Sequence, residues 1–236
     1  MIPPVSDDSK RPDATRQATF ILTRFEQWAL PRMAASLPRW VMPDHLTGLG
    51  VLGATLIAVS YFSTRWTPAW LWVANLGLLI HWLGDSLDGT LARVRKHERP
   101  RYGFYLDHLT DAYSTTAIGL GLGFSPYMLL SVSLAIVIAY LILSINVYLE
   151  THVFRVFRYG YGFMGPTEVR LLLLGLNLVA LFVGPMGFRW MGIGYTVFDP
   201  FGVAAALGMI ALLVTRAWRN LSELGRLEPP GTRRPD

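Results

Sequence analysis

Four aspartates within 27 residues, at positions 85, 88, 107 and 111, are the side chains best spaced to do chemistry. Asp85 and Asp88 are three residues apart and Asp107 and Asp111 are four apart, so on a helix each pair shares one face. Two antiparallel helices joined by a short loop would bring the pairs together. Carboxylates at close range repel unless a cation neutralises them. Oxygen ligands beside a phosphate favour Mg²⁺ or Mn²⁺, so the spacing predicts a metal site.

The residues after the first pair suit a phosphorylated ligand. Gly89 lets a ligand approach the backbone closely, and Ala92 keeps the same helix face shallow. Arg93 carries forked donors that match phosphate oxygens. A metal, small residues and an arginine together predict a diphosphate site.

The aspartates belong to a longer pattern of fixed spacing. It reads D-x-x-D-G-x-x-A-R from Asp85 to Arg93 and, after a gap of nine residues, G-x-x-x-D-x-x-x-D from Gly103 to Asp111. This pattern resembles the signature of the CDP-alcohol phosphotransferase (phosphatidyltransferase) family, with every defining position filled. The resemblance covers residues 14–217. Residues 42–47 also resemble the family's Pro-Asn-x-Ile/Leu-Thr segment before the first span, with Asp44 where asparagine is usual.

The resemblance implies a membrane enzyme of phospholipid biosynthesis. Such enzymes transfer a substituted phosphate group from a CDP-linked donor to an acceptor hydroxyl and release CMP. The donor is either CDP-diacylglycerol or a CDP-aminoalcohol, and the signature does not separate them. The resemblance also implies a homodimer, a six-span bundle and an N-terminal interfacial helix.

Site roles follow from the same resemblance. A two-metal centre of Mg²⁺ or Mn²⁺ would be held by Asp85, Asp88, Asp107 and Asp111. Asp111 would also act as the general base that takes the proton from the acceptor hydroxyl. The CDP group would bind against Asp85, Gly89, Ala92, Arg93 and Gly103.

The stretch Gly-Pro-Thr-Glu at 165–168 has two interpretations. Thr167 fits a helix N-cap, and Glu168 fits the positive end of a helix. Alternatively, Glu168 and Arg170 face an acceptor pocket together with Arg155. A similar stretch occurs in the aminoalcohol phosphotransferase branch of the family, but it is too short to assign the branch.

Two histidines lie beside the aspartates and leave a choice open. His81 precedes Asp85 by one helical turn, and His108 follows Asp107 directly. Each is either an outer partner of the metal ligands or a polar side chain satisfied inside the bundle.

Composition places these residues in a membrane protein. The 236-residue chain is 52% hydrophobic and 16% charged, whereas soluble proteins carry about 25% charged residues. Its apolar residues cluster in runs near the ~20 residues that cross a bilayer. The net charge of +5 comes from arginines and lysines between these runs, so we expect it to set topology rather than to bind nucleic acid.

The predicted fold class is an all-α integral membrane bundle of six transmembrane helices. A disordered tail (1–13) and an interfacial amphipathic helix (14–40) precede the catalytic domain (41–220), and a disordered tail (221–236) follows it. The predicted spans are 46–62, 68–86, 109–124, 128–149, 169–183 and 198–217.

The positive charges indicate how the bundle is oriented. With the N-terminus inside, 19 of the 21 lysines and arginines fall in cytoplasmic segments, and only Arg65 and Arg189 do not. This asymmetry predicts a multi-pass protein with both termini and the active site on the cytoplasmic side.

Two other functions use membrane carboxylates. An intramembrane prenyltransferase also holds a diphosphate with aspartates and Mg²⁺, but its aspartates usually form two widely separated motifs. A cation transporter would place carboxylates near mid-membrane, often on broken helices of an internal repeat. The sequence shows no such repeat, and its four aspartates are predicted at the inner membrane edge.

Overall fold

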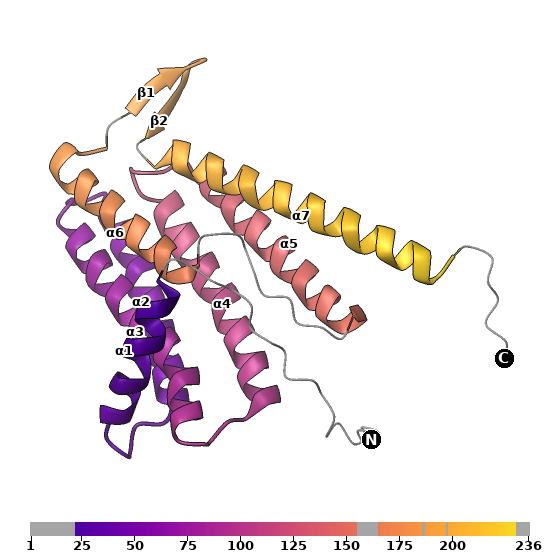
Figure 1. The fold of residues 1–236 in the computed structure, drawn as a ribbon. Helices are drawn as coiled ribbons and strands as arrows, with labels where there is room; N and C mark the ends of the chain where they lie inside the picture. Colours follow the sequence, from indigo (N-terminus) through magenta and orange to yellow (C-terminus); the bar gives the residue numbers. More distant parts are fainter. Residues whose placement is uncertain (1–21, 155–164, 186, 197, 230–236) are drawn as a thin grey trace, which may run out of the picture.

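The computed structural model describes residues 22–154, 165–185, 187–196 and 198–229. Within these residues the chain forms seven helices and two short strands (Figure 1). The elements are α1 Thr23–Ser36, α2 Pro43–Ser63, α3 Trp70–Val94, α4 Pro100–Gly123, α5 Leu130–Phe154, α6 Pro166–Val183, β1 Gly187–Trp190, β2 Ile193–Thr196 and α7 Asp199–Leu227.

Helix α2 is the element on which both aspartate-bearing helices pack. A Cβ added to Gly84 of α3 would lie 2.3 Å from the backbone nitrogen of Gly50 on α2, so the two backbones touch there. Farther along α2, a Cβ on Gly121 of α4 would lie 2.5 Å from the backbone of Ala58. Small residues thus allow close helix packing, as is common in membrane bundles.

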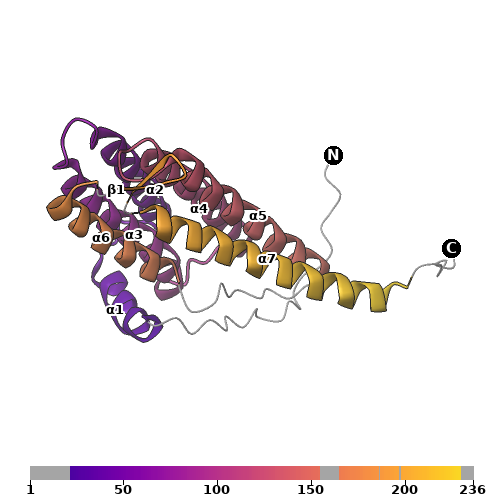
Figure 2. The same ribbon diagram turned by 90° about the horizontal axis from the view of Figure 1, so that it is seen from above.

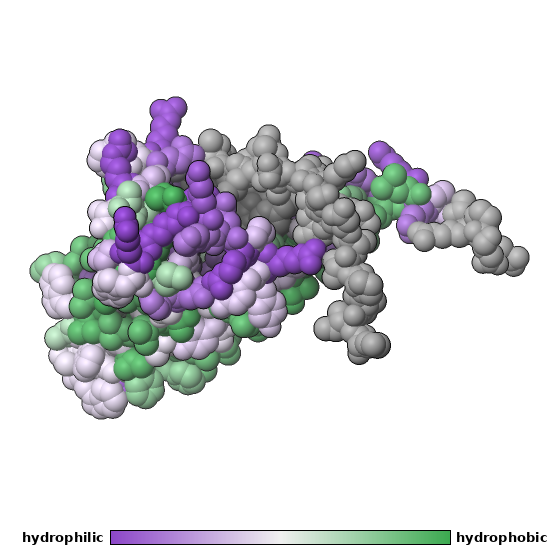
Figure 3. All heavy atoms as spheres, turned by 90° about the horizontal axis from the view of Figure 1, so that it is seen from below, coloured by the Kyte–Doolittle hydropathy of each residue, from purple (hydrophilic) through white to green (hydrophobic). Residues whose placement is uncertain are grey.

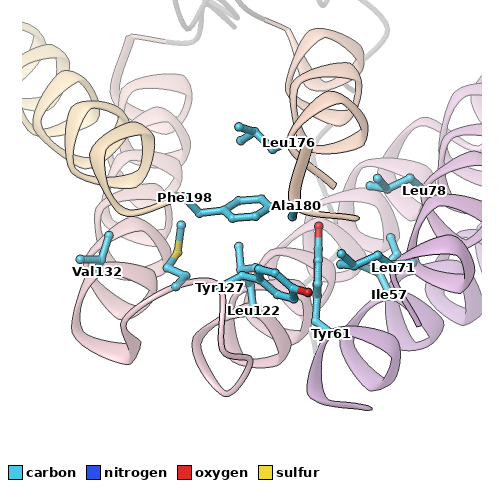
Figure 4. Packing of buried hydrophobic residues seen from close by; sticks show 12 residues of the cluster. Ile57, Tyr61, Leu71, Leu78, Leu122, Tyr127, Val132, Leu176, Ala180 and Phe198 are labelled. Carbon is cyan, nitrogen blue, oxygen red and sulfur yellow. The ribbon is translucent and has the colours of Figure 1, made fainter. Parts of the chain in front are cut away.

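The largest buried cluster joins residues of several helices (Figure 4). Tyr61 of α2, Leu71 of α3, Ala180 of α6 and Phe198 just before α7 are all fully buried in it. The Tyr61 hydroxyl donates to Asn177 Oδ1 at 3.0 Å, and Asn177 Nδ2 donates to Asn75 Oδ1 at 2.8 Å. These bonds tie α2, α3 and α6 together inside the bundle.

Helices α5 and α7 lie side by side, and α7 extends beyond the rest of the bundle (Figures 1 and 2). The hairpin of β1 and β2 protrudes where α6 ends and α7 begins (Figure 1). Asp199 fixes this junction, since its carboxylate accepts from the backbone N–H groups of Thr196 and Leu129 at 2.6 and 2.8 Å.

The hairpin corrects the prediction of an all-α chain. The sequence predicts no strand between the spans 169–183 and 198–217. Met191 and Gly192 instead have positive φ angles, 49° and 81°. Two such residues match the right-handed twist of a two-residue hairpin, so the flanking residues pair in register from Gly187 with Thr196 to Trp190 with Ile193.

Four of the described helices, α2, α5, α6 and α7, are long and apolar enough to cross a membrane. The prediction of six spans is therefore met in part, and the chain is an integral multi-pass membrane protein. Helices α3 and α4 have 25 and 24 residues but fall short in hydropathy. Tryptophans and Asp85 lower the mean hydropathy of α3, and Asp107 and Asp111 lower that of α4.

The ends of the chain differ from the predicted boundaries. Helix α7 continues to Leu227, so residues 221–227 are helical rather than part of a tail. Helix α1 ends at Ser36, two residues before Pro38, because the residue before a proline disfavours helical backbone. The predicted tail at 1–13 and the predicted helix residues 14–21 lie outside the described residues.

Candidate metal and phosphate site

A cleft forms where α3 and α4 face each other across α2. Helix α2 contributes the residues of its first turns, α3 those around the first aspartate pair, and α4 the positions next to the second pair. The lining residues are Thr47, Gly50, Val51, His81, Asp85, Asp88, Thr110 and Ser114.

The four predicted aspartates lie around this cleft. The carboxyl group of Asp111 lies within electrostatic range of Asp85, Asp107 and Asp88, and Asp88 lies within range of Asp85 and Asp107. The two aspartate pairs therefore converge. Helices α3 and α4, which carry them, pack mainly on α2 and not directly on each other.

Asp88 is held by two donors. The Thr47 hydroxyl donates to Oδ2 at 2.7 Å, and the backbone N–H of Gly89 donates to Oδ1 at 2.5 Å. The Thr47 bond reaches across from α2, so it fixes the position of α3 as well as the carboxylate. Thr47 lies in the segment 42–47 that resembles the family's entry to the first span. The sequence pattern did not predict that it would contact a site aspartate.

Asp85 is paired with a cation from α6. Arg170 Nη2 donates to Asp85 Oδ2 at 2.5 Å, and the two side chains are only 12% and 23% exposed. The same nitrogen lies 3.3 Å from His81 Nε2. Of the two predicted acceptor-pocket residues that the structure describes, Glu168 and Arg170, Arg170 is the one that reaches the aspartates.

The second aspartate pair has a histidine beside it. Asp107, His108 and Asp111 each offer a ligand atom, and these atoms lie within 4.8 Å of one another. His108 Nδ1 is 3.4 Å from Asp107 Oδ2, and its ring stacks on Tyr148 with centroids 4.7 Å apart. This placement suits an outer partner of the carboxylates, one of the two interpretations of His108.

The residues expected to meet the CDP group lie at the end of α3 and the start of α4. Arg93 Nη1 is 3.5 Å from where a Cβ on Gly89 would stand, so the guanidinium lies over this glycine. Arg93 Nη2 also donates to the Thr90 hydroxyl at 3.1 Å. Ala92 is half-buried, and a Cβ on Gly103 would meet nothing within 4 Å.

Glu168 serves as a cap. Its Oε2 accepts from the backbone N–H of Gly165 at 3.0 Å, and its Oε1 accepts from that of Leu22 at 2.9 Å. The Thr167 hydroxyl donates to Glu26 of α1. Glu168 therefore ties the start of α6 to the start of α1, and Arg155 lies outside the described residues.

The donor set fits a hard divalent cation. The ligand atoms around the cleft are mainly carboxylate oxygens, and the cleft is also lined by the Thr47 and Thr110 hydroxyls, Ser114 and the imidazole of His81. Oxygen ligands of this kind suit Mg²⁺ or Mn²⁺ rather than softer metals. Lys96, Arg99 and Arg101 are exposed where α3 ends and α4 begins. On the face seen in Figure 3, hydrophilic residues gather on one part and apolar residues lie beside them.

Comparison with known proteins agrees with this geometry. The sequence model of the CDP-alcohol phosphatidyltransferase family matches residues 40–218, well over half of the chain. A phosphatidylinositol phosphate synthase from Cutibacterium acnes (strain DSM 16379 / KPA171202) is 34% identical over 92 residues. That match spans 39% of this chain and 42% of the relative. The chain therefore belongs to the CDP-alcohol phosphatidyltransferase family, membrane transferases of substituted phosphate groups that act in phospholipid synthesis.

Proposed function

We propose that the enzyme transfers a phosphatidyl group from CDP-diacylglycerol to a hydroxyl of a phosphorylated polyol and releases CMP. The observation that carries this proposal is the cleft around which four aspartates converge, beside the mostly buried side chain of Arg170. The name of the matched relative, phosphatidylinositol phosphate synthase, supports this donor and this class of acceptor.

The reaction needs groups that bind the diphosphate. Asp85, Asp88, Asp107 and Asp111 would hold two Mg²⁺ or Mn²⁺ ions. When bound, these ions supply charge neutralisation of the diphosphate and of the departing CMP. Asp85 would also contact the CDP group.

The cytidine diphosphate would lie against the end of α3. Gly89 and Ala92 leave room for it, and Arg93 supplies donors to its phosphates. The open space at Gly103 serves the same ligand from the α4 side.

The acceptor hydroxyl needs a base. Asp111 takes its proton, and the oxygen then attacks the phosphorus attached to diacylglycerol while the bond to CMP breaks. Arg170 would bind the phosphate that the acceptor carries, since a guanidinium matches phosphate oxygens in two-point contact. Glu168 belongs to the same end of α6 but acts there as a cap.

The second candidate is a CDP-aminoalcohol with a lipid acceptor. The Gly-Pro-Thr-Glu stretch at 165–168 is similar to one in that branch. The capping bonds of Glu168 explain this stretch structurally, so it favours neither branch.

The orientation in the membrane belongs to the same proposal. All of α2 to α7 would cross the bilayer, with α3 and α4 completing the six spans. Both termini and the cleft would lie on the cytoplasmic side, as the arginine and lysine distribution predicts. A homodimer stays a prediction from the family resemblance.

A substrate panel tests the proposal. The purified protein in nanodiscs with Mg²⁺ receives CDP-diacylglycerol or CDP-choline, each with inositol phosphate, glycerol phosphate, inositol, serine or diacylglycerol, and CMP release is measured. We expect release only with CDP-diacylglycerol and a phosphorylated polyol. Release with CDP-choline and diacylglycerol, or with an unphosphorylated acceptor alone, would overturn the proposed substrates.

A further inference from the structure

His81 occupies a buried position between three helices beside the cleft. It lies on α3 one turn before Asp85 and is only 6% exposed. Its Nδ1 is 3.1 Å from the backbone carbonyl oxygen of Gly50 on α2, and its Nε2 is 3.3 Å from Arg170 Nη2 on α6. One imidazole therefore joins α2, α3 and α6.

The two contacts of His81 define its tautomer. A carbonyl oxygen can only accept, so Nδ1 carries the proton and donates to Gly50. Nε2 of a neutral imidazole then has a free lone pair, which accepts from the guanidinium of Arg170. The carbonyl of Gly50 thereby sets which ring nitrogen faces the arginine.

Arg170 Nη2 is shared between two acceptors. One of its hydrogens points to Asp85 Oδ2 at 2.5 Å and the other to His81 Nε2. A long side chain loses rotamer entropy when it is held in place, and a group that is already held loses less on binding a ligand. The two acceptors together fix the plane of the guanidinium, which neither would do alone.

We propose that His81 is a positioning residue that presets the Arg170 guanidinium for the phosphate of the acceptor. This proposal rests on the proposed function, because it needs a phosphorylated acceptor. His81 acts through Arg170 and need not touch the substrate. Its loss should therefore weaken acceptor binding while the chemical step and the binding of CDP-diacylglycerol change little.

Three substitutions separate the two hydrogen bonds of His81. His81→Gln places an amide oxygen near the position of Nε2 and keeps an acceptor for Arg170. His81→Asn places its amide near Nδ1 and keeps a donor for Gly50 only. His81→Leu keeps the apolar volume and removes both. We expect KM for inositol phosphate to rise roughly tenfold in the Asn and Leu variants, the size of one hydrogen bond to a charged group, and less than threefold in the Gln variant.

Asn75→Ala is the matched control for helix packing. It removes a bond between the same two helices, α3 and α6, ten residues or about 15 Å along α3 from Asp85. We expect this variant to lower the melting temperature without changing KM for the acceptor. In all variants, KM for CDP-diacylglycerol should stay within about twofold of the original value.

Each outcome bears on one proposal. A rise in acceptor KM that Gln reverses, with kcat nearly constant, supports positioning by His81. If the Gln, Asn and Leu variants all had the same KM for inositol phosphate, or if Asn75→Ala raised that KM as well, positioning by His81 would be overturned. The proposed donor and acceptor would still stand. If the unsubstituted protein releases no CMP with any phosphorylated polyol, the proposed function itself fails.

Discussion

At the scale of single residues, the sequence predicted which carboxylates converge but not what holds them. Asp85 and Asp88 could be placed on one helix face because three-residue spacing is local. The partners of these two residues are distant in the chain: Thr47 lies 41 positions from Asp88, and Arg170 lies 85 positions from Asp85. Such pairs depend on how helices pack, so no spacing rule could have found them.

Loss of the Thr47 hydroxyl should weaken metal binding. Thr47→Val keeps the shape of the side chain but removes the donor to Asp88 Oδ2. Outer partners of metal ligands typically contribute 10–100-fold to affinity, so we expect the Mg²⁺ concentration for half-maximal activity to rise about tenfold. Mn²⁺ binding to the protein without substrate, followed by electron paramagnetic resonance, should weaken in parallel.

Two variants control this prediction. Thr47→Ser restores the hydroxyl and should restore the Mg²⁺ dependence. Thr55→Val also removes a hydroxyl from α2, but this hydroxyl bonds to Tyr113 and Val51 and not to an aspartate. As a control, it should leave the Mg²⁺ dependence unchanged. An unchanged Mg²⁺ dependence in Thr47→Val would show that this hydrogen bond does not position Asp88 for metal.

At the scale of helices, hydrophobic runs located each helix from α2 to α7 but misjudged some ends. Helix α7 extends to Leu227 because Leu221, Leu224 and Leu227 continue a helical spacing that the apolar run did not include. The hairpin was missed because its signal is a two-residue turn, Met191-Gly192, within a glycine-rich stretch. The contact of Gly50 with Gly84 depends on how α2 and α3 pack against each other. A hydrophobic run in the sequence locates one helix but does not show its packing partner.

A methyl group at the contact between α2 and α3 should disturb the site. In Gly84→Ala the new Cβ would lie 2.3 Å from the Gly50 nitrogen, so the helices must separate. Overpacking of this kind costs about 1–3 kcal/mol. We expect a lower melting temperature in detergent and lower CMP release.

The same helix pair offers a control for that substitution. A Cβ on Gly48 of α2 would meet nothing within 4 Å, so Gly48→Ala should leave both the melting temperature and CMP release nearly unchanged. If Gly84→Ala also behaved like the unsubstituted protein, the close contact would not position the aspartates.

At the scale of the whole molecule, composition and charge predicted a membrane protein and its family signature predicted the transferase. Both are confirmed by the family match over residues 40–218 and by four helices suited to crossing a membrane. Membership of this family also favours the phosphotransferase over the prenyltransferase and transporter hypotheses. The structure adds that, among α2 to α7, the two aspartate-bearing helices are the ones that fall short of the hydropathy of a membrane span, as expected where carboxylates are retained for function.

The proposed orientation in the membrane can be tested by labelling single introduced cysteines, because the chain has no cysteine of its own. Glu98→Cys lies in the loop that joins the aspartate-bearing helices α3 and α4, and Met191→Cys lies at the tip of the hairpin, where the side chain is 84% exposed. In intact cells, a membrane-impermeant maleimide should label the cysteine at 191 and spare the one at 98. After the membrane is opened, both should react. The reverse pattern in intact cells would place the cleft on the outer side.

The central claim is that the four-aspartate cleft carries out the transfer, and Asp111 tests it most directly. CMP release is measured from CDP-diacylglycerol and inositol phosphate with Mg²⁺ for the unsubstituted protein, Asp111→Asn and Glu223→Gln. Glu223 is exposed near the end of α7, so its variant controls for the loss of one negative charge. We expect Glu223→Gln to keep full activity. Asp111→Asn should lose at least 100-fold, the lower end of what a general base contributes, while its melting temperature stays close to that of the unsubstituted protein. Full activity in a folded Asp111→Asn protein would contradict the account.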